Sequence, residues 1–173
     1  EPNKFKGVIE TVATATTSHD VNGRLIVECD LSQATTFTHA MAGGAGGQIG
    51  IVSFKNMPAD TGVQNGTTAT IIFTQNSTVP QSGVGNTQFP AGIGTFVTIK
   101  GFENGALVTG INTTALVAAS AGSASTVFLS NIASQRDFVS FFIHYNGGTN
   151  TTANSYQVYA TKSGNFAQGN LIV

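Results

Sequence analysis

Apolar and polar residues alternate most clearly in the stretch Asp137–Gly148, with the sequence DFVSFFIHYNGG. An extended chain places every second residue on the same face. One face then carries Val139, Phe141, Ile143 and Tyr145, and the other carries Phe138, Ser140, Phe142 and His144. Because both faces hold aromatic or branched residues, the pattern predicts a central strand covered on both sides. Asn146-Gly147-Gly148 permits positive φ and predicts a chain reversal into a second strand at Ser155–Thr161.

Similar short runs, rich in β-branched and aromatic residues, recur along the chain between turn signals. They predict strands at Phe5–Val12, Arg24–Asp30, Ala34–Met41, Gln48–Phe54, Thr67–Gln75, Gly94–Phe102, Ala106–Ile111 and Thr126–Ser130, with a last pairing in Phe166–Val173. Thr113–Ser120 is the only plausible helical turn, and it is too short to shape the fold. The sequence therefore predicts an all-β protein, an antiparallel β-sandwich of jelly-roll-like type with roughly nine or ten strands and no significant helix.

The chain is expected to form one domain over residues 21–173, with residues 1–20 as an N-terminal arm or connecting strand. Within that arm, Thr14–Asp20 is predicted to be a polar connector. In the domain itself, Met57–Gly62 is predicted to be a turn. Two long polar segments, Asn76–Pro90 and Asn146–Asn154, are predicted to be exposed loops, where binding residues often lie. The candidate contact residues in them are Asn76, Ser82, Asn86, Asn146, Gly147, Asn150 and Asn154.

The composition argues against several classes of partner. Only 9% of the residues are charged and the formal net charge is −1, so the chain has no basic surface for nucleic acid. No apolar run of about 18 residues exists, which predicts no membrane insertion. The chain begins at Glu1 without an apolar leader, as expected of a processed product, a trimmed chain or a piece of a longer polypeptide.

No residue pattern predicts catalysis, a cofactor or a metal ion. Cys29 is a single cysteine within an alternating strand and is expected to be a small buried apolar residue. The three histidines (His19, His39 and His144) have no metal-ligand spacing, and the eight carboxylates are scattered along the chain. Arg136-Asp137, directly before the central strand, predicts either a local ion pair or turn closure, or else a contact with a partner.

Several segments resemble, in the same order, a module of structural proteins of marine tailed phages, especially cyanophages. These segments are LIVECDLSQATTFTHAM at 25–41, IGIVSFKNMPADTG at 49–62, TTATIIFTQNST at 67–78, and SFFIHYNGGTNTTANSYQVYATKSGNF at 140–166. The resemblance implies a β-sandwich in a virion component, either a capsid decoration or a tail-fibre or appendage protein. It also implies assembly as a homotrimer, and it brings no catalytic residues.

We therefore expect a non-enzymatic structural protein, located in the virion, that oligomerises and presents surface loops. Its expected partners are other copies of itself, virion proteins of the shell or tail, and a glycan or protein of the host surface. Two alternatives remain open: a subunit of an extracellular filament or adhesin assembled by strand exchange, with residues 1–20 as the donor, or a lectin-like glycan-binding domain. The absence of Trp argues against the glycan-binding alternative.

Overall fold

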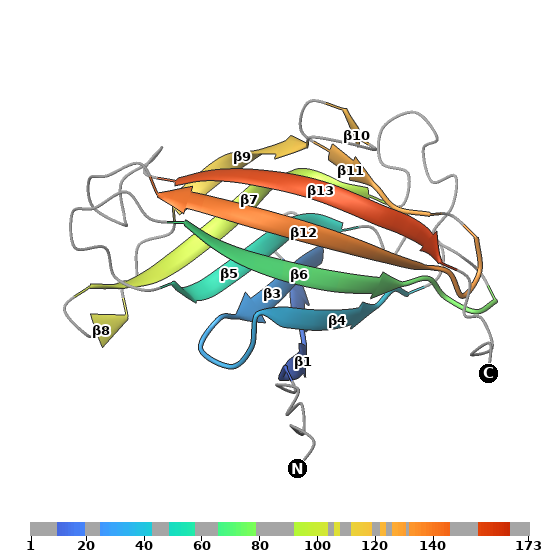
Figure 1. Ribbon diagram of the computed structural model, residues 1–173, viewed down its shortest axis with the longest axis horizontal. Coiled ribbons are helices and arrows are strands. Elements are labelled where there is room, and N and C mark those ends of the chain that lie inside the picture. The colour runs from blue at the N-terminus through green and yellow to red at the C-terminus, as the bar shows by residue number, and fades with distance from the viewer. Residues whose placement is uncertain are drawn as a thin grey trace, which may run out of the picture.

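The computed structural model describes residues 10–19, 25–42, 49–57, 66–78, 92–103, 106–107, 112–118, 122–123, 126–130, 132–145 and 156–166. Within these ranges all regular structure is β-strand, in two mixed sheets, and no helix occurs. The all-β prediction is therefore confirmed. Figure 1 shows the strands in two layers, with β6, β12 and β13 in front of β3, β5 and β7.

The layer nearer the viewer is called the front sheet. Its pairing order is β1-β4-β6-β12-β13-β9. The strands are β1 (Val12–Thr14), β4 (Thr36–Ala40), β6 (Gly66–Thr74), β12 (Arg136–Tyr145), β13 (Tyr156–Phe166) and β9 (Asn112–Ala118). The predicted strand in Asp137–Gly148 is β12, and it is central, because β6 and β13 pair with it on its two sides.

The layer behind it is called the back sheet, and its pairing order continues from β9 as β7-β5-β3-β2. Its strands are β7 (Gly92–Glu103), β5 (Ile49–Met57), β3 (Leu25–Asp30) and β2 (Thr16–His19). Three short strands complete the described part: β8 (Ala106–Leu107) and β11 (Thr126–Phe128) both pair with β7, and β10 (Gly122–Ser123) pairs with β11.

Between β3 and β7 the chain alternates between the two sheets. β3, β5 and β7 lie side by side and parallel in the back sheet, whereas β4 and β6 lie side by side and parallel in the front sheet. A parallel pair needs a connection that returns the chain to its starting end, and here a strand of the opposite sheet makes that connection. The prediction of antiparallel sheets is therefore wrong in this part, because a crossover between sheets leaves no local sequence signal.

Two places join the sheets. Strand β9 pairs with β7 through Asn112–Ala115 and with β13 through Leu116–Ala118, so it belongs to both. The second place joins β1 and β2, the two ends of the pairing order. Ala15 alone separates β1 in the front sheet from β2 in the back sheet, and its backbone amide donates to the Thr38 carbonyl at 2.9 Å. Strands that bend from one sheet into the other form the corners of packed sheets. Ala15 is buried, and its small side chain suits such a corner.

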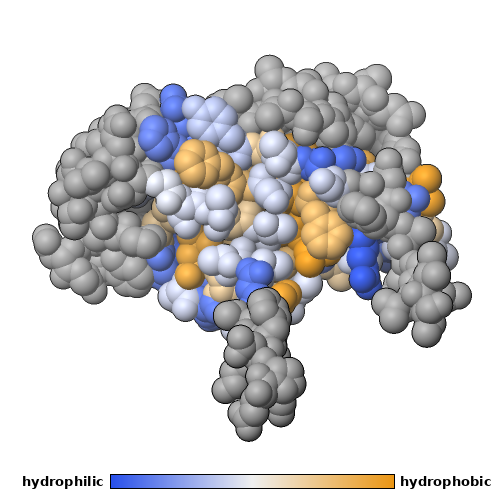
Figure 2. All heavy atoms as spheres, in the orientation of Figure 1, coloured by the Kyte–Doolittle hydropathy of each residue, from blue (hydrophilic) through white to orange (hydrophobic). Residues whose placement is uncertain are grey.

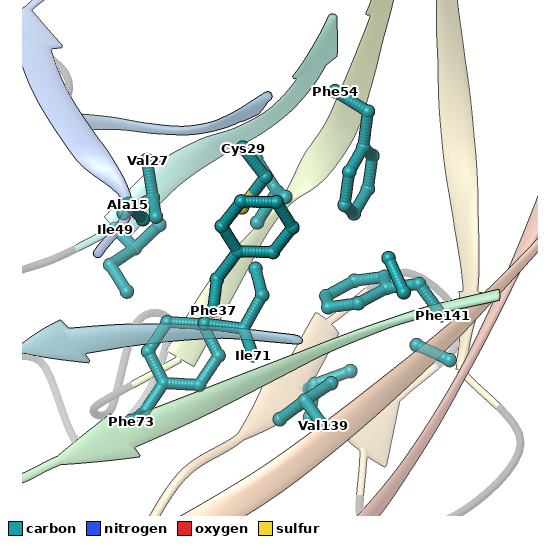
Figure 3. Packing of buried hydrophobic residues seen from close by; sticks show 14 of the residues in the cluster. Ala15, Val27, Cys29, Phe37, Ile49, Phe54, Ile71, Phe73, Val139 and Phe141 are labelled. Carbon is teal, nitrogen blue, oxygen red and sulfur yellow. The ribbon is translucent and has the colours of Figure 1, made fainter. Parts of the chain in front are cut away.

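The apolar core lies between the sheets. Every second residue is buried from Leu25 to Cys29 on β3, from Ala69 to Phe73 on β6 and from Asp137 to Ile143 on β12, as their alternating sequences predict. The rings of Phe54 on β5 and Phe141 on β12 meet across the core with centroids 5.2 Å apart and an interplanar angle of 66°. Figure 3 shows side chains of both sheets, among them Cys29 and Phe37, pointing toward one another. The predicted burial of Cys29 is confirmed, because its exposed fraction is 0%.

Three local predictions are wrong. Part of the predicted connector at Thr14–Asp20 is strand β2, which pairs with β3 although all four of its side chains are exposed. The predicted helical turn at Thr113–Ser120 coincides with strand β9, which its pairing with β7 and β13 holds extended. Met57 ends strand β5 instead of beginning a turn. Residues 5–9 of the predicted strand Phe5–Val12 lie outside the described residues, and its last residue begins β1. All of the predicted strand Phe166–Val173 except Phe166 also lies outside them.

Candidate functional site

Of the seven predicted contact residues, Asn76 lies in the part that the structure describes. Ser82, Asn86, Asn146, Gly147, Asn150 and Asn154 lie outside it. Asn76 follows strand β6 and is half-buried; its Oδ1 accepts a hydrogen bond from the Thr78 amide at 2.9 Å, and its carbonyl accepts one from the Ser134 amide at 3.3 Å. The Asn76 side chain therefore stabilises a turn, as Asn side chains commonly do.

Asp137 closes the segment that leads from β11 into β12. It is 1% exposed, and its Oδ2 accepts a hydrogen bond from the Ser130 amide at 2.5 Å. The Lys162 ammonium on the neighbouring strand β13 lies 3.6 Å from its Oδ1. The Gln75 side-chain amide donates to the Ser130 carbonyl, so β6 also holds this segment. Turn closure, one of the two predicted roles of Arg136-Asp137, is what Asp137 performs, and its ion pair is with Lys162.

A second polar cluster lies where β3 and β5 end beside each other. Asp30 Oδ1 accepts hydrogen bonds from Ser32 Oγ and Asn56 Nδ2, both at 2.6 Å, and from the Ser32 amide at 3.0 Å. Burial alone raises the pKa of the Asp30 carboxyl, but the hydrogen bonds from Ser32 and Asn56 and the charge of Lys55 together lower that pKa below its usual value. Asn56 has a φ of 59°, a left-handed conformation that Asn tolerates better than most residues. The carboxylate is thus used for local structure.

Cys29 and His39 are both buried, and burial shifts the pKa of each. Burial, followed by the charge of Glu28, raises the pKa of the Cys29 thiol to about 12, so the thiol stays protonated. His39 lies on β4 with its ring edge toward Phe73 at a centroid distance of 5.9 Å. Burial lowers the pKa of His39. Among the residues that the structure describes, no three His, Cys, Asp or Glu side chains are arranged to hold a metal ion.

The most distinctive surface is the outward side of the front sheet, called the front face. It consists of the outward residues of four adjacent strands: Thr36, Thr38 and Ala40 on β4; Gly66, Thr68, Thr70, Ile72 and Thr74 on β6; Arg136, Phe138, Ser140, Phe142 and His144 on β12; Gln157, Tyr159, Thr161 and Ser163 on β13. Arg136 is the one formally charged residue in this set. Figure 2 shows hydrophobic side chains among near-neutral ones over β6 and β12.

Aromatic side chains stand out on the front face. Phe142 is 43% exposed and Phe138 is 36% exposed. The expected cover on both sides of this strand is therefore wrong for these two residues: the inward face packs in the core, and the outward face meets solvent. His144 is half-buried and stacks on Phe142 with an interplanar angle of 10°.

Phe142 has a defined seat on the front face. A Cβ added to Gly66 would lie 2.6 Å from both Cε2 and Cζ of the Phe142 ring, so the ring lies against the bare backbone of Gly66. On the other side Tyr159, directly opposite in register, has its ring centroid 6.3 Å away. The cross-strand neighbours thus hold an exposed aromatic ring in place.

Two pairs of polar groups on this face bond to each other. Thr70 Oγ1 and Ser140 Oγ lie 3.2 Å apart across β6 and β12. The Tyr159 hydroxyl donates to Gln157 Oε1 at 2.8 Å. Since these groups already have partners, covering them with another surface costs less than covering unpaired polar groups.

Sequence reasoning placed the candidate contacts in loops and missed the front face. The available signal was the pair Phe138 and Phe142 on the second face of Asp137–Gly148, and the alternating pattern predicted that both residues are buried.

In the described part of the chain, no helix has the length and apolar character to cross a membrane. A scan against protein-family models and searches of curated proteins and of solved structures found no significant match.

Proposed function

We propose that the chain is a non-enzymatic structural component of a phage virion, either a capsid decoration or a tail-fibre or appendage protein, that works by assembling with copies of itself and with other virion proteins. The observation that carries the proposal is the front face: exposed Phe138 and Phe142 lie among Thr and Ser residues with Arg136 as its one charge. Protein interfaces are enriched in aromatic residues and depleted of charges at their centre. The succession of motifs at 25–78 and 140–166 supports the choice of a virion.

We also infer that the two sheets form a β-sandwich of jelly-roll-like type with about the predicted number of strands. The inward residues of both sheets share one apolar core, and the pairing path runs through ten strands, from β1 to β2. The corners at Ala15 and β9 support this arrangement. A sheet packed on a second sheet presents its outward residues as one continuous surface, which suits contacts between the subunits of a repeating particle.

Immunogold electron microscopy tests this proposal. An antibody raised against the purified domain is applied to virus particles and to host cells from the same culture. We expect gold at one recurring position on the particles, at the capsid, the tail or the fibres. Label confined to cell-surface filaments would instead support the filament or adhesin alternative, and label on neither structure would overturn the virion proposal.

A second function is favoured by one specific observation, the cluster of Phe142, His144 and Tyr159. Exposed rings next to hydroxyl and amide groups can stack on a neutral sugar. Two observations weigh against this function: the Tyr159 hydroxyl bonds to Gln157, and the Thr70 and Ser140 hydroxyls bond to each other. A glycan array with the purified domain and its Phe142→Thr variant tests glycan binding directly.

A further inference from the structure

We infer that the front face is a self-association surface, on which a second copy of this chain packs its own front face. The inference deepens the proposed structural role and rests on it, because it names the partner and the surface. Its starting point is a mismatch: strand β12 has the sequence of a strand covered on both faces, yet Phe142 on the outward face is 43% exposed. A second front face would cover that residue.

Charge favours a second copy as the occupant. Two identical faces that carry several charges of the same sign would repel each other, so a self-associating surface needs few charges or charges of both signs. The front face has a single formal charge, on Arg136 in its last row, while its centre around Ser140 is uncharged. Glu10, which accepts hydrogen bonds from Thr35 and Thr36, lies at the β4 margin. In a two-fold pairing whose axis crosses the strands near Ser140, the two copies of Arg136 lie at opposite ends.

The size of the face also fits. Nine residues of β12, from Arg136 to His144, extend over roughly 30 Å, and four neighbouring strands are about 19 Å wide. Covering such a face on two copies buries about 1,100 Å² in total, which is above the roughly 1,000 Å² that a biological interface should clear and just below the 1,200 Å² at which stable interfaces begin. Sheets that pack face to face lie about 10 Å apart, a distance that side chains the size of Phe can fill.

The hydrogen bonds already made on the front face favour a second copy of the chain over a sugar as its partner. A sugar is recognised through donors and acceptors that await its hydroxyls, whereas the Thr70–Ser140 and Tyr159–Gln157 pairs have already bonded to each other. Such pairs enter a dry contact at small cost. Phe142, seated against Gly66 and flanked by Tyr159, has the form of a preorganised aromatic anchor.

The test is sedimentation velocity over a wide range of protein concentration, supported by far-UV circular dichroism. The parent is expected to be an even-numbered oligomer, and Phe142→Thr should weaken the association at least tenfold, as loss of an anchor does. Threonine keeps the strand propensity of the position. Ile132→Thr is the matched control, because Ile132 is 56% exposed but lies in the turn before β12 and outside the front face; its association should be unchanged.

A charge exchange at Ser140 makes the test independent of folding. Ser140→Lys and Ser140→Glu should each be monomeric alone, because like charges meet at the centre of the contact. An equimolar mixture should recover the dimer. A parent that stays monomeric at every concentration, or association that ignores both Phe142→Thr and the Ser140 charges, overturns the inference.

Failure of this inference differs from failure of the virion proposal. A trimer insensitive to these variants overturns the front-face contact and leaves the immunogold test untouched. Binding of maltohexaose by a monomeric parent, followed by NMR and lost in Phe142→Thr, would assign the face to sugar and overturn the inference.

Discussion

Replacement of Asp137 by Asn tests how strongly this carboxylate holds the segment that leads from β11 into β12 against the front sheet. The substitution keeps the shape of the side chain but removes its negative charge. The Lys162 ammonium lies 3.6 Å from that carboxylate, and the Lys162 side chain is only 12% exposed. Breaking a buried ion pair by removing one partner costs roughly 3–5 kcal/mol. Because the Lys162 ammonium retains some contact with water, we expect the lower end, about 3 kcal/mol. In a domain of this size, that lowers Tm by roughly 6–12 °C.

The loss is measured by urea unfolding, followed by far-UV circular dichroism. Lys55→Met is the control, because it breaks ion pairs of the same chemistry at a more exposed place, to Glu28 at 3.1 Å and to Asp30 at 3.9 Å. The side chains of Lys55 and Glu28 are 33% and 23% exposed. Exposed pairs contribute at most about 1 kcal/mol. If Asp137→Asn and Lys55→Met destabilise the protein equally within about 0.5 kcal/mol, the closing role of Asp137 is refuted.

Three further predictions follow from buried or bonded groups. Phe141→Ala should destabilise the fold by roughly 3–5 kcal/mol in urea unfolding, whereas Ile132→Ala, at an exposed position, should change little. Cys29, buried with its pKa raised to about 12, should react with a thiol reagent only when urea opens the fold; rapid native labelling would contradict its burial. Burial lowers the pKa of His39 in the folded protein. As the pH falls below about 6.5, the imidazole is therefore protonated in the unfolded chain before it is protonated in the folded one. Stability then decreases as the pH falls below about 6.5, and His39→Leu should flatten the stability–pH curve in that range.

Strand positions were predictable wherever one face of a strand is buried. Strand β3 alternates buried and half-buried residues over Leu25–Asp30, and its sequence LIVECD shows the same alternation. Strand β2 has no such signal, because Thr16–His19 is polar and exposed throughout and is extended by its pairing with β3. A short Ala-, Leu- and Val-containing run such as Thr113–Ser120 fits a helix or a strand equally well, and tertiary pairing decides between them.

Pairing order and polar partners were beyond the reach of the sequence. The alternation of β3 to β7 between two sheets joins residues far apart in the chain, and hydrophobic periodicity says nothing about which neighbour a strand chooses. Turn closure by Asp137 was predictable from its position before a strand. Its partner Lys162 was not, because only the register of β12 and β13 brings the two residues together.

The second face of β12 joins the sequence to the proposed assembly. Phe138 and Phe142 add nothing to the core of one chain, since they point away from it. Exposed aromatic residues at the centre of a sheet are an aggregation hazard unless something covers them. The chain places two of them on its central strand, seats Phe142 against Gly66, and has two pairs of polar groups on the same face that bond to each other. If the proposed assembly forms, both faces of β12 are covered, which would account for its two-sided sequence. The same reasoning makes the Ser140 charge exchange the decisive experiment, because only a second copy can turn two monomeric variants back into one complex.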